Sequence, residues 1–173
     1  MRCSLFLLVL ILSACSAPPE KEINSYVDIA GFFEAEAVRL DQANPEVKKT
    51  VARNAATETR TVRNVNWITE LSLFAESDIN KPAWRDSYRV TKKDGNVTYV
   101  ATDTTLKTRE INITKDSLGK IREIKIKNQT NNMLYSSSEQ LLYVPDSVYQ
   151  INKQQHVVIV GENRYLVKGL FTP

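Results

Sequence analysis

Glycine and histidine are scarce in this chain of 173 residues, which contains five glycines and one histidine. Loops that hold nucleotide phosphates depend on glycine, and the sequence contains neither a P-loop nor a Gly-x-Gly-x-x-Gly pattern. Zinc sites need clusters of histidine, cysteine and carboxylate side chains, and no such cluster accompanies the single histidine. The composition therefore argues against a nucleotide-binding enzyme and a zinc enzyme, and we expect no cofactor.

Cysteine is also scarce, and the two cysteines, Cys3 and Cys15, both lie near the start of the chain. Arg2 is followed by about ten mostly apolar residues and then by the small pair Ser13-Ala14, a pattern typical of a secretory signal peptide. The apolar run is too short for a membrane span, which takes about 20 residues. We therefore expect residues 1–14 to be a signal peptide, whose removal leaves Cys15 without a disulfide partner in the chain.

The four residues Leu12-Ser13-Ala14-Cys15 resemble the lipobox of bacterial lipoproteins. This resemblance implies that the sulfur of Cys15 carries a diacylglyceryl group and that the signal is cleaved just before this residue. Residues 15–22 would then form a lipidated tether to the membrane. Each CH₂ group of the acyl chains that is buried in the bilayer contributes about 0.8 kcal/mol to membrane binding. Ser16 stands where aspartate tends to retain enterobacterial lipoproteins on the inner membrane, so the resemblance favours a location in the cell envelope at the outer membrane.

The remaining 173 − 14 = 159 residues are enough for one domain with a sizeable core. Apolar residues recur at helical spacing over 23–40 and 66–76, whereas alternation from 87 onward predicts antiparallel strands joined by short turns. We therefore predict a single α+β domain over 23–173. Its curved antiparallel sheet of about six to nine strands is mostly a meander, packed on one face by the two N-terminal helices.

Three segments of the predicted sheet have distinctive patterns. Residues 46–63 form a polar hairpin whose charges suit the edge of a sheet. The apolar phase slips between Ile121 and Ile124, which predicts a β-bulge near Arg122-Glu123. Two further apolar runs predict long strands over residues 133–144 and 148–160.

Five aromatic side chains are candidates for lining a ligand site: Phe32, Phe33, Trp67, Phe74 and Trp84. The sequence leaves open whether they line an apolar cavity between sheet and helices or fill a core. For Trp84, on a polar loop, stacking on a ligand and plugging the open end of the sheet both remain open. Ile68 is expected to lie beside Trp67 and Phe74 on the buried stripe of the second helix.

These features lead to a hypothesis of a non-enzymatic lipoprotein that binds an apolar or lipid ligand. The predicted architecture resembles the half-barrels of lipoprotein carriers, which also pair a bent antiparallel sheet with helices, although fold alone does not establish function. The segment "ESDINKPAW", residues 76–84, resembles small uncharacterised lipoproteins of Bacteroidota, and this resemblance implies no activity.

Two alternatives remain open. The chain could be an accessory subunit of an outer-membrane complex that docks on an envelope protein through hairpin 46–63. It could also be a hydrolase that uses the carboxylates Glu76, Asp78 and Asp86, although these side chains also suit a helix end and a turn with local salt bridges. The net charge of +3 and the expected compartment give no reason to expect a nucleic-acid partner.

Overall fold

A computed structural model describes residues 26–172 of the chain, so the predicted signal peptide, tether and Cys15 lie outside the described residues. The helices in this part are α1 (Ile29–Ala43), α2 (Trp67–Glu70), α3 (Ser72–Ala75) and a short 3-10 helix, η1 (Pro82–Trp84). The strands are β1 (Val47–Arg53), β2 (Ala56–Val62), β3 (Tyr88–Lys93), β4 (Asn96–Ala101), β5 (Thr108–Lys115), β6 (Ile121–Asn131), β7 (Tyr135–Val144), β8 (Val148–Val157) and β9 (Gly161–Phe171).

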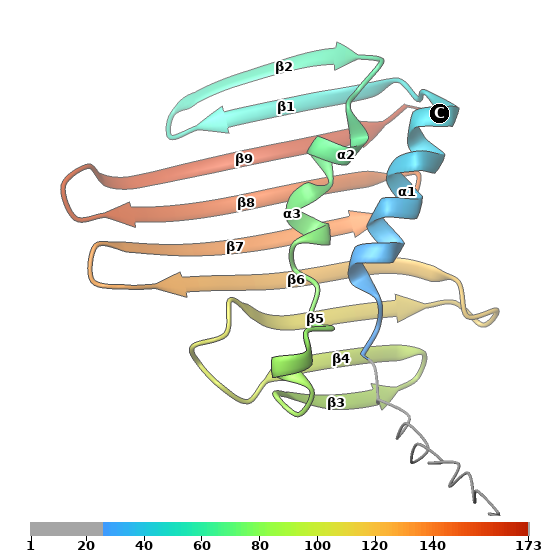
Figure 1. Cartoon of the computed structure of the whole chain (residues 1–173). Helices are drawn as coiled ribbons and strands as arrows, with labels where there is room; N and C mark the ends of the chain where they lie inside the picture. Colours follow the sequence, from blue (N-terminus) through green and yellow to red (C-terminus); the bar gives the residue numbers. More distant parts are fainter. Residues whose placement is uncertain (1–25, 173) are drawn as a thin grey trace, which may run out of the picture.

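The strands form one open antiparallel sheet in the order β2-β1-β9-β8-β7-β6-β5-β4-β3. From β3 to β9 each strand pairs with the next along the chain, as a meander does. The first hairpin joins this meander at its far side, because β1 pairs with β9. The predicted α+β class with a curved, mostly meandering antiparallel sheet is therefore confirmed (Figure 1).

The helices α1, α2 and α3 all lie on one face of the sheet, across the strands (Figure 1). The helix α1 starts at Ile29 and not at residue 23 as predicted. Asp28 caps the helix there, because its side chain accepts a hydrogen bond of 2.7 Å from the backbone N–H of Gly31. It ends at Asn44, which adopts a left-handed φ of 42° and donates its N–H to the Leu40 carbonyl.

The second predicted helix is broken into α2 and α3. Asn66 caps α2 through its side chain, which accepts from the N–H of Thr69 at 3.0 Å. Leu71, with φ −97° and ψ 3°, then leaves the helical conformation, and its side chain is buried. The prediction of one continuous helix over 66–76 is therefore wrong, because burial of Leu71 at the break outweighs helix propensity in this short segment.

The core lies between the sheet and the helices. Apolar residues alternate along the central strands, and they pair across strands: Ile111 with Ile126, and Ile113 with Ile124. The largest fully buried side chains include Trp67, Tyr143, Tyr149, Phe33 and Phe74, contributed by both layers. Burial of side chains of this size is the main stabilising contribution to such a fold, at about 25 cal/mol per Å² of apolar area.

The predicted β-bulge is present on β6. Thr114 pairs with Glu123 and the next residue, Lys115, pairs with Ile121, so Arg122 is the extra residue. This extra residue shifts the side chains by one position and brings both Ile124 and Ile126 onto the covered face. The phase slip in the sequence is therefore explained.

The hairpin over 46–63 is confirmed as β1 and β2, paired from Val47↔Val62 to Arg53↔Ala56 at the edge of the sheet. The predicted strand over 133–144 begins too early, because β7 starts at Tyr135, and the predicted strand over 148–160 ends too late, because β8 ends at Val157. The ladder between β7 and β8 stops at the pair Tyr135↔Val157, and the residues beyond it form turns. Among the described helices, none is long and apolar enough to span a membrane.

Candidate functional site

Three of the five candidate aromatic residues belong to the packed interior. Phe33, on α1, lies with its ring centroid 4.9 Å from that of Phe74 on α3 and 5.2 Å from that of Tyr143 on β7. Trp67, on α2, stacks on Phe171 of β9 with centroids 5.5 Å apart. Phe33, Trp67 and Phe74 each contact other aromatic rings directly and are almost inaccessible to solvent, so they act as core residues between sheet and helices.

The other two candidates are partly buried and lie apart. Phe32 packs edge-on against Phe33, with centroids 5.1 Å apart, at the margin of the core. Trp84 ends η1, beyond the helical pair, where the ammonium of Lys81 lies 4.2 Å from the centroid of its ring. The five aromatic residues therefore do not converge on one site.

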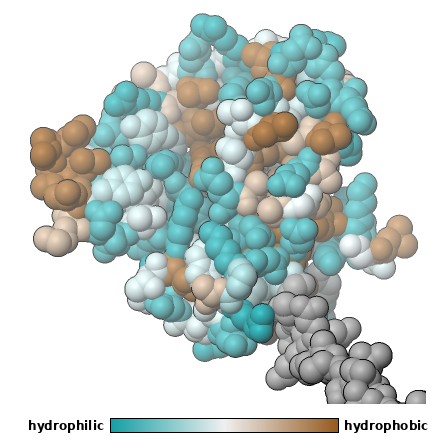
Figure 2. Space-filling view, viewed as in Figure 1, coloured by the Kyte–Doolittle hydropathy of each residue, from teal (hydrophilic) through white to brown (hydrophobic). Residues whose placement is uncertain are grey.

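An apolar groove lies on the helical layer, between α1 and the pair α2–α3. Its volume is about 430 Å³, and its floor is formed by the buried side chains of Phe33, Ala37 and Leu71. Its rim carries Val38, which is 53% exposed, and Ile68, which is 75% exposed. Figure 2 shows apolar surface over α1 and α2 on this face. We take this groove as the candidate functional site.

The local sequence explains why the groove exists. On α1, Phe33 and Ala37 face inward while Val38 is exposed, so the apolar stripe is wider than the sheet can cover. On α2, Trp67 points into the core and its neighbour Ile68 points out. The expectation that Ile68 is buried is wrong, because two adjacent helical residues lie about 100° apart around the helix and Trp67 occupies the inner position.

The rim of the groove is acidic. Glu34 and Glu76 line it together with the hydroxyl-bearing Ser72, which donates to the carbonyl of Thr69 at 2.9 Å. The carboxylate of Glu76 lies 3.8 Å from the ammonium of Lys107, at the surface. A ligand with an apolar body and an uncharged or cationic polar end fits such a rim better than an anionic one.

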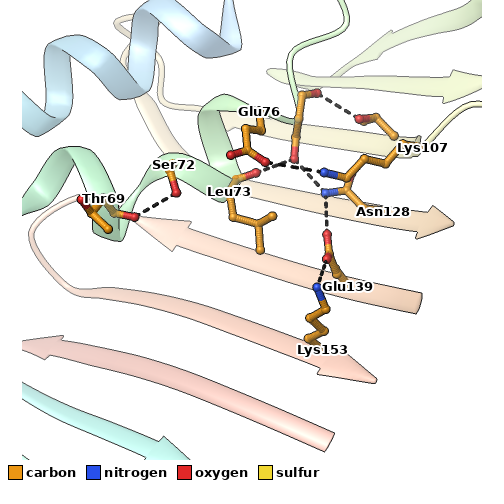
Figure 3. A network of polar contacts seen from close by, with 10 residues as sticks. Thr69, Ser72, Leu73, Glu76, Lys107, Asn128, Glu139 and Lys153 are labelled. Carbon is orange, nitrogen blue, oxygen red and sulfur yellow. Dashed lines mark hydrogen bonds and ion pairs between the residues drawn. The ribbon is translucent and has the colours of Figure 1, made fainter. Parts of the chain in front are cut away.

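A polar network fixes the end of α3 to the sheet below the groove (Figure 3). Asn128 on β6 donates 2.8 Å to the hydroxyl of Ser77, just after α3, and 3.2 Å to the carboxylate of Glu139 on β7. The other oxygen of Glu139 lies 3.0 Å from the ammonium of Lys153 on β8. The backbone carbonyl of Ser77 also accepts from Thr108 at 3.2 Å, so β5 joins the same network.

Charge pairing in this network shifts the pKa of Lys153. Burial by itself would lower the pKa of the Lys153 ammonium, but the hydrogen bond and negative charge of Glu139, with a contribution from Tyr135, raise it above its ordinary value. Glu139 has both carboxylate oxygens engaged, one by Asn128 and one by Lys153. The network therefore holds secondary-structure elements together and offers no free carboxylate for catalysis.

A second polar cluster fixes α1, one wall of the groove. The hydroxyl of Tyr143 donates 2.5 Å to Glu36, and Arg39 donates to both Glu36 and Asp146, the latter at 2.7 Å. Burial would raise the pKa of Glu36, but the hydrogen bonds from Arg39 and Tyr143 outweigh it and lower that pKa. Burial raises the pKa of Tyr143, so this hydroxyl stays protonated at ordinary pH.

The carboxylates of the hydrolase hypothesis occupy separate structural positions. Glu76 approaches Lys107, whereas Asp78 accepts from the backbone N–H of Asn80 at 3.1 Å and so shapes the turn after α3. Asp86 follows η1 and lines a different hollow. Within residues 26–172, no group of three histidine, cysteine or carboxylate side chains is arranged to hold a metal ion.

Comparison with known protein families, with curated proteins and with solved structures finds no match to this chain. The assignment of the groove as candidate site therefore rests on its geometry in this chain. Sequence reasoning placed Ile68 on the buried stripe, and it missed the rim residue Val38 and the buried polar residues Asn128 and Glu139. The inward position of Glu139 was available as a signal, because it continues the alternation of Leu141 and Tyr143 along the same strand.

Proposed function

We propose that the protein is a cell-envelope lipoprotein, anchored through a lipid on Cys15, whose domain is a non-enzymatic module for an apolar ligand. The supporting observation is the groove between α1 and α2–α3. Its volume of about 430 Å³ lies in the range of about 300–1,000 Å³ typical of small-molecule sites. A hydrocarbon chain is the ligand that suits an apolar floor with few polar groups.

The groove is a better location for this ligand than the space between sheet and helices. Phe33 and Phe74 pack on each other there, and Trp67 packs on the strand residue Phe171, so a ligand would have to separate these rings. At the groove, in contrast, a ligand would cover Val38 and Ile68, which are already exposed to solvent. Covering an exposed apolar side chain is favourable without any rearrangement of the core.

A photoactivatable fatty alcohol, whose polar end is uncharged and so suits the acidic rim, tests this proposal with the full-length chain held in lipid nanodiscs. We expect cross-links, located by mass spectrometry, on α1 and α2 around Val38 and Ile68. Ile68→Asp should weaken this labelling about tenfold, because burial of an isoleucine side chain is worth about 1.5–3 kcal/mol. Leu118→Asp is the matched control, since Leu118 is an exposed apolar residue on the turn between β5 and β6.

Either of two results would remove the proposal. One is labelling around the groove no stronger than labelling of the turn at Leu118. The other is labelling that Ile68→Asp leaves unchanged. Equal losses in Ile68→Asp and Leu118→Asp would indicate adsorption to any apolar surface.

A docking role for hairpin 46–63 is the second candidate, because β2 forms an edge of the sheet and most of its residues are exposed. Edge strands can accept a strand from a partner, although the ion pair Glu58–Arg60 would oppose a purely apolar contact. Cross-linking in intact cells can compare the parent chain with a Glu58→Lys, Arg60→Glu double variant. An unchanged set of cross-linked envelope proteins would count against this role.

A further inference from the structure

Several of the most exposed apolar side chains in the described part of the chain lie together at one end of the sheet, away from the groove. They are Met133 and Leu134 in the turn between β6 and β7, and Val158, Ile159 and Val160 in the turn between β8 and β9. These five side chains are between 60% and 95% exposed. Figure 2 shows them as the broad brown area at the left, where Figure 1 places both turns. We call them the apolar tip.

The two turns of the apolar tip form one unit. Strands β7 and β8 are paired up to Tyr135↔Val157, so the turns leave the sheet side by side. Beyond that pair, the backbone N–H of Val158 donates to the carbonyl of Leu134 at 3.2 Å and links the two turns. The apolar side chains are therefore presented together and not as isolated exposed residues.

The turns of the apolar tip satisfy much of their own backbone. The side chain of Asn132 accepts hydrogen bonds from the N–H groups of Leu134 and Tyr135, at 3.0 and 2.9 Å, and its own N–H donates to Tyr135. In the other turn, the N–H of Val160 donates to Val157 at 3.1 Å. Such internal pairing lowers the cost of moving a turn out of water into a medium that offers no hydrogen bonds.

Charge is absent from the same segments. Residues 128–138 and 157–161 contain no Asp, Glu, Lys or Arg, although these types make up 25% of the chain. Tyr135, half-buried at the base of the tip, supplies an aromatic side chain of the kind enriched at membrane–water interfaces. A charged side chain here would oppose entry into hydrocarbon, and the sequence places none.

We propose that the apolar tip inserts into the acyl-chain region of a lipid bilayer and gives the domain a membrane contact of its own. A second protein is a poorer occupant, because stable interfaces take about 20–30 residues on each side and about one hydrogen bond per 100–200 Å². Five apolar side chains on two projecting turns offer neither. A bilayer requires apolar side chains and a backbone that satisfies much of its own hydrogen bonding, and the tip offers both. The inference does not depend on the groove or its ligand.

Tryptophan reporters can locate the tip relative to the bilayer. The full-length chain is reconstituted in phosphatidylcholine vesicles whose acyl chains carry bromine, a quencher of tryptophan fluorescence, and in unbrominated vesicles. The reporter variant is Ile159→Trp. Its control is Leu118→Trp, because Leu118 is 91% exposed but stands alone on a turn at the opposite end of the sheet. The fluorescence of the parent, which contains Trp67 and Trp84, is subtracted from both.

We expect the bromine to quench the reporter at 159 and to leave the one at 118 unquenched. Adding Leu134→Asp and Val158→Asp to Ile159→Trp should reduce the inserted fraction about tenfold or more, because each removes the transfer of a large apolar side chain. Both positions are exposed, so we expect the fold to be unaffected. The fluorescence of the buried Trp67 checks that the core is retained.

Three results would overturn the inference. The first is equal quenching at 159 and 118, which would mean that the whole domain simply lies near the bilayer. The second is no quenching at 159. The third is a blue shift of the reporter at 159 that grows with protein concentration without vesicles, which would identify a second copy of the chain as the occupant.

Discussion

The groove and the apolar tip expose the same kinds of side chain in opposite shapes. The groove is concave, and its floor of Phe33, Ala37 and Leu71 belongs to the core of the domain. The tip projects from the sheet on two turns, and Ile159 within it is almost fully exposed. The groove is therefore coupled to the stability of the fold, whereas the tip is free to vary without loss of stability.

The largest difference between these regions should appear on truncating one side chain in each. Phe33→Ala should lower the free energy of unfolding by about 3–5 kcal/mol, because it removes a buried ring that packs on Phe74 and Tyr143. Ile159→Ser should change it by no more than about 0.5 kcal/mol. Urea denaturation followed by circular dichroism measures both, and comparable losses in the two variants would contradict the comparison.

The two regions also differ in how far the sequence predicts them. The floor of the groove follows from helical spacing, which places Phe33, Ala37 and Leu40 on one face of a helix. The turn at the tip does not follow from the sequence, because Val158, Ile159 and Val160 are β-branched and fit a strand equally well. What ends the strand is the register with β7, together with Gly161 at a φ of 83°, and register is a non-local property.

The polar network beneath the groove was unpredictable for the same reason. Asn128, Glu139 and Lys153 come from three strands and meet only because the registers of β6, β7 and β8 align them. Each is an ordinary polar residue in its own segment. The antiparallel meander, the edge hairpin and the bulge on β6 were predictable, since they depend on patterns within one segment or between neighbouring segments.

The network should have the next largest effect on stability. Glu139→Ala should cost about 2 kcal/mol, less than for a fully buried pair, because the Lys153 side chain is 30% exposed and water can partly replace the carboxylate. It should also weaken labelling of the groove by the fatty alcohol, since it loosens α3 from the sheet, and leave quenching at the tip unchanged.

A double variant separates the cost of leaving the Lys153 charge unpaired from the cost of removing the Glu139 side chain. Replacing Glu139 and Lys153 together by leucine should bring the free energy of unfolding to within about 1 kcal/mol of the parent, because no unpaired charge remains. Urea denaturation of the parent, Glu139→Ala and the double variant provides the measurement. A double variant as unstable as Glu139→Ala would show that the cost comes from the lost hydrogen bond between Asn128 and Glu139 and not from the unpaired charge of Lys153.

The smallest effect should be the pH dependence of the contribution that Glu36 makes to stability. Glu36 holds α1 through Tyr143 and Arg39, and its pKa is lowered in the fold below the ordinary value of 4.5. A carboxylate with a lowered pKa stabilises the fold fully above its unfolded pKa, and this contribution is lost as the pH falls through the folded pKa. Glu36→Gln removes the titrating group and leaves a similar shape.

At neutral pH the parent should exceed Glu36→Gln in free energy of unfolding by about 1 kcal/mol, a modest value because the Arg39 side chain is 44% exposed. This difference should shrink as the pH falls below 4.5, since protonation removes the charge that the variant already lacks. Quenching of the reporter at the tip should not follow the protonation of Glu36, because Glu36 lies on α1 and not on the turns of the tip. Urea denaturation across a pH series measures the difference, and a constant gap between parent and variant would show that Glu36 acts through packing and not through its charge.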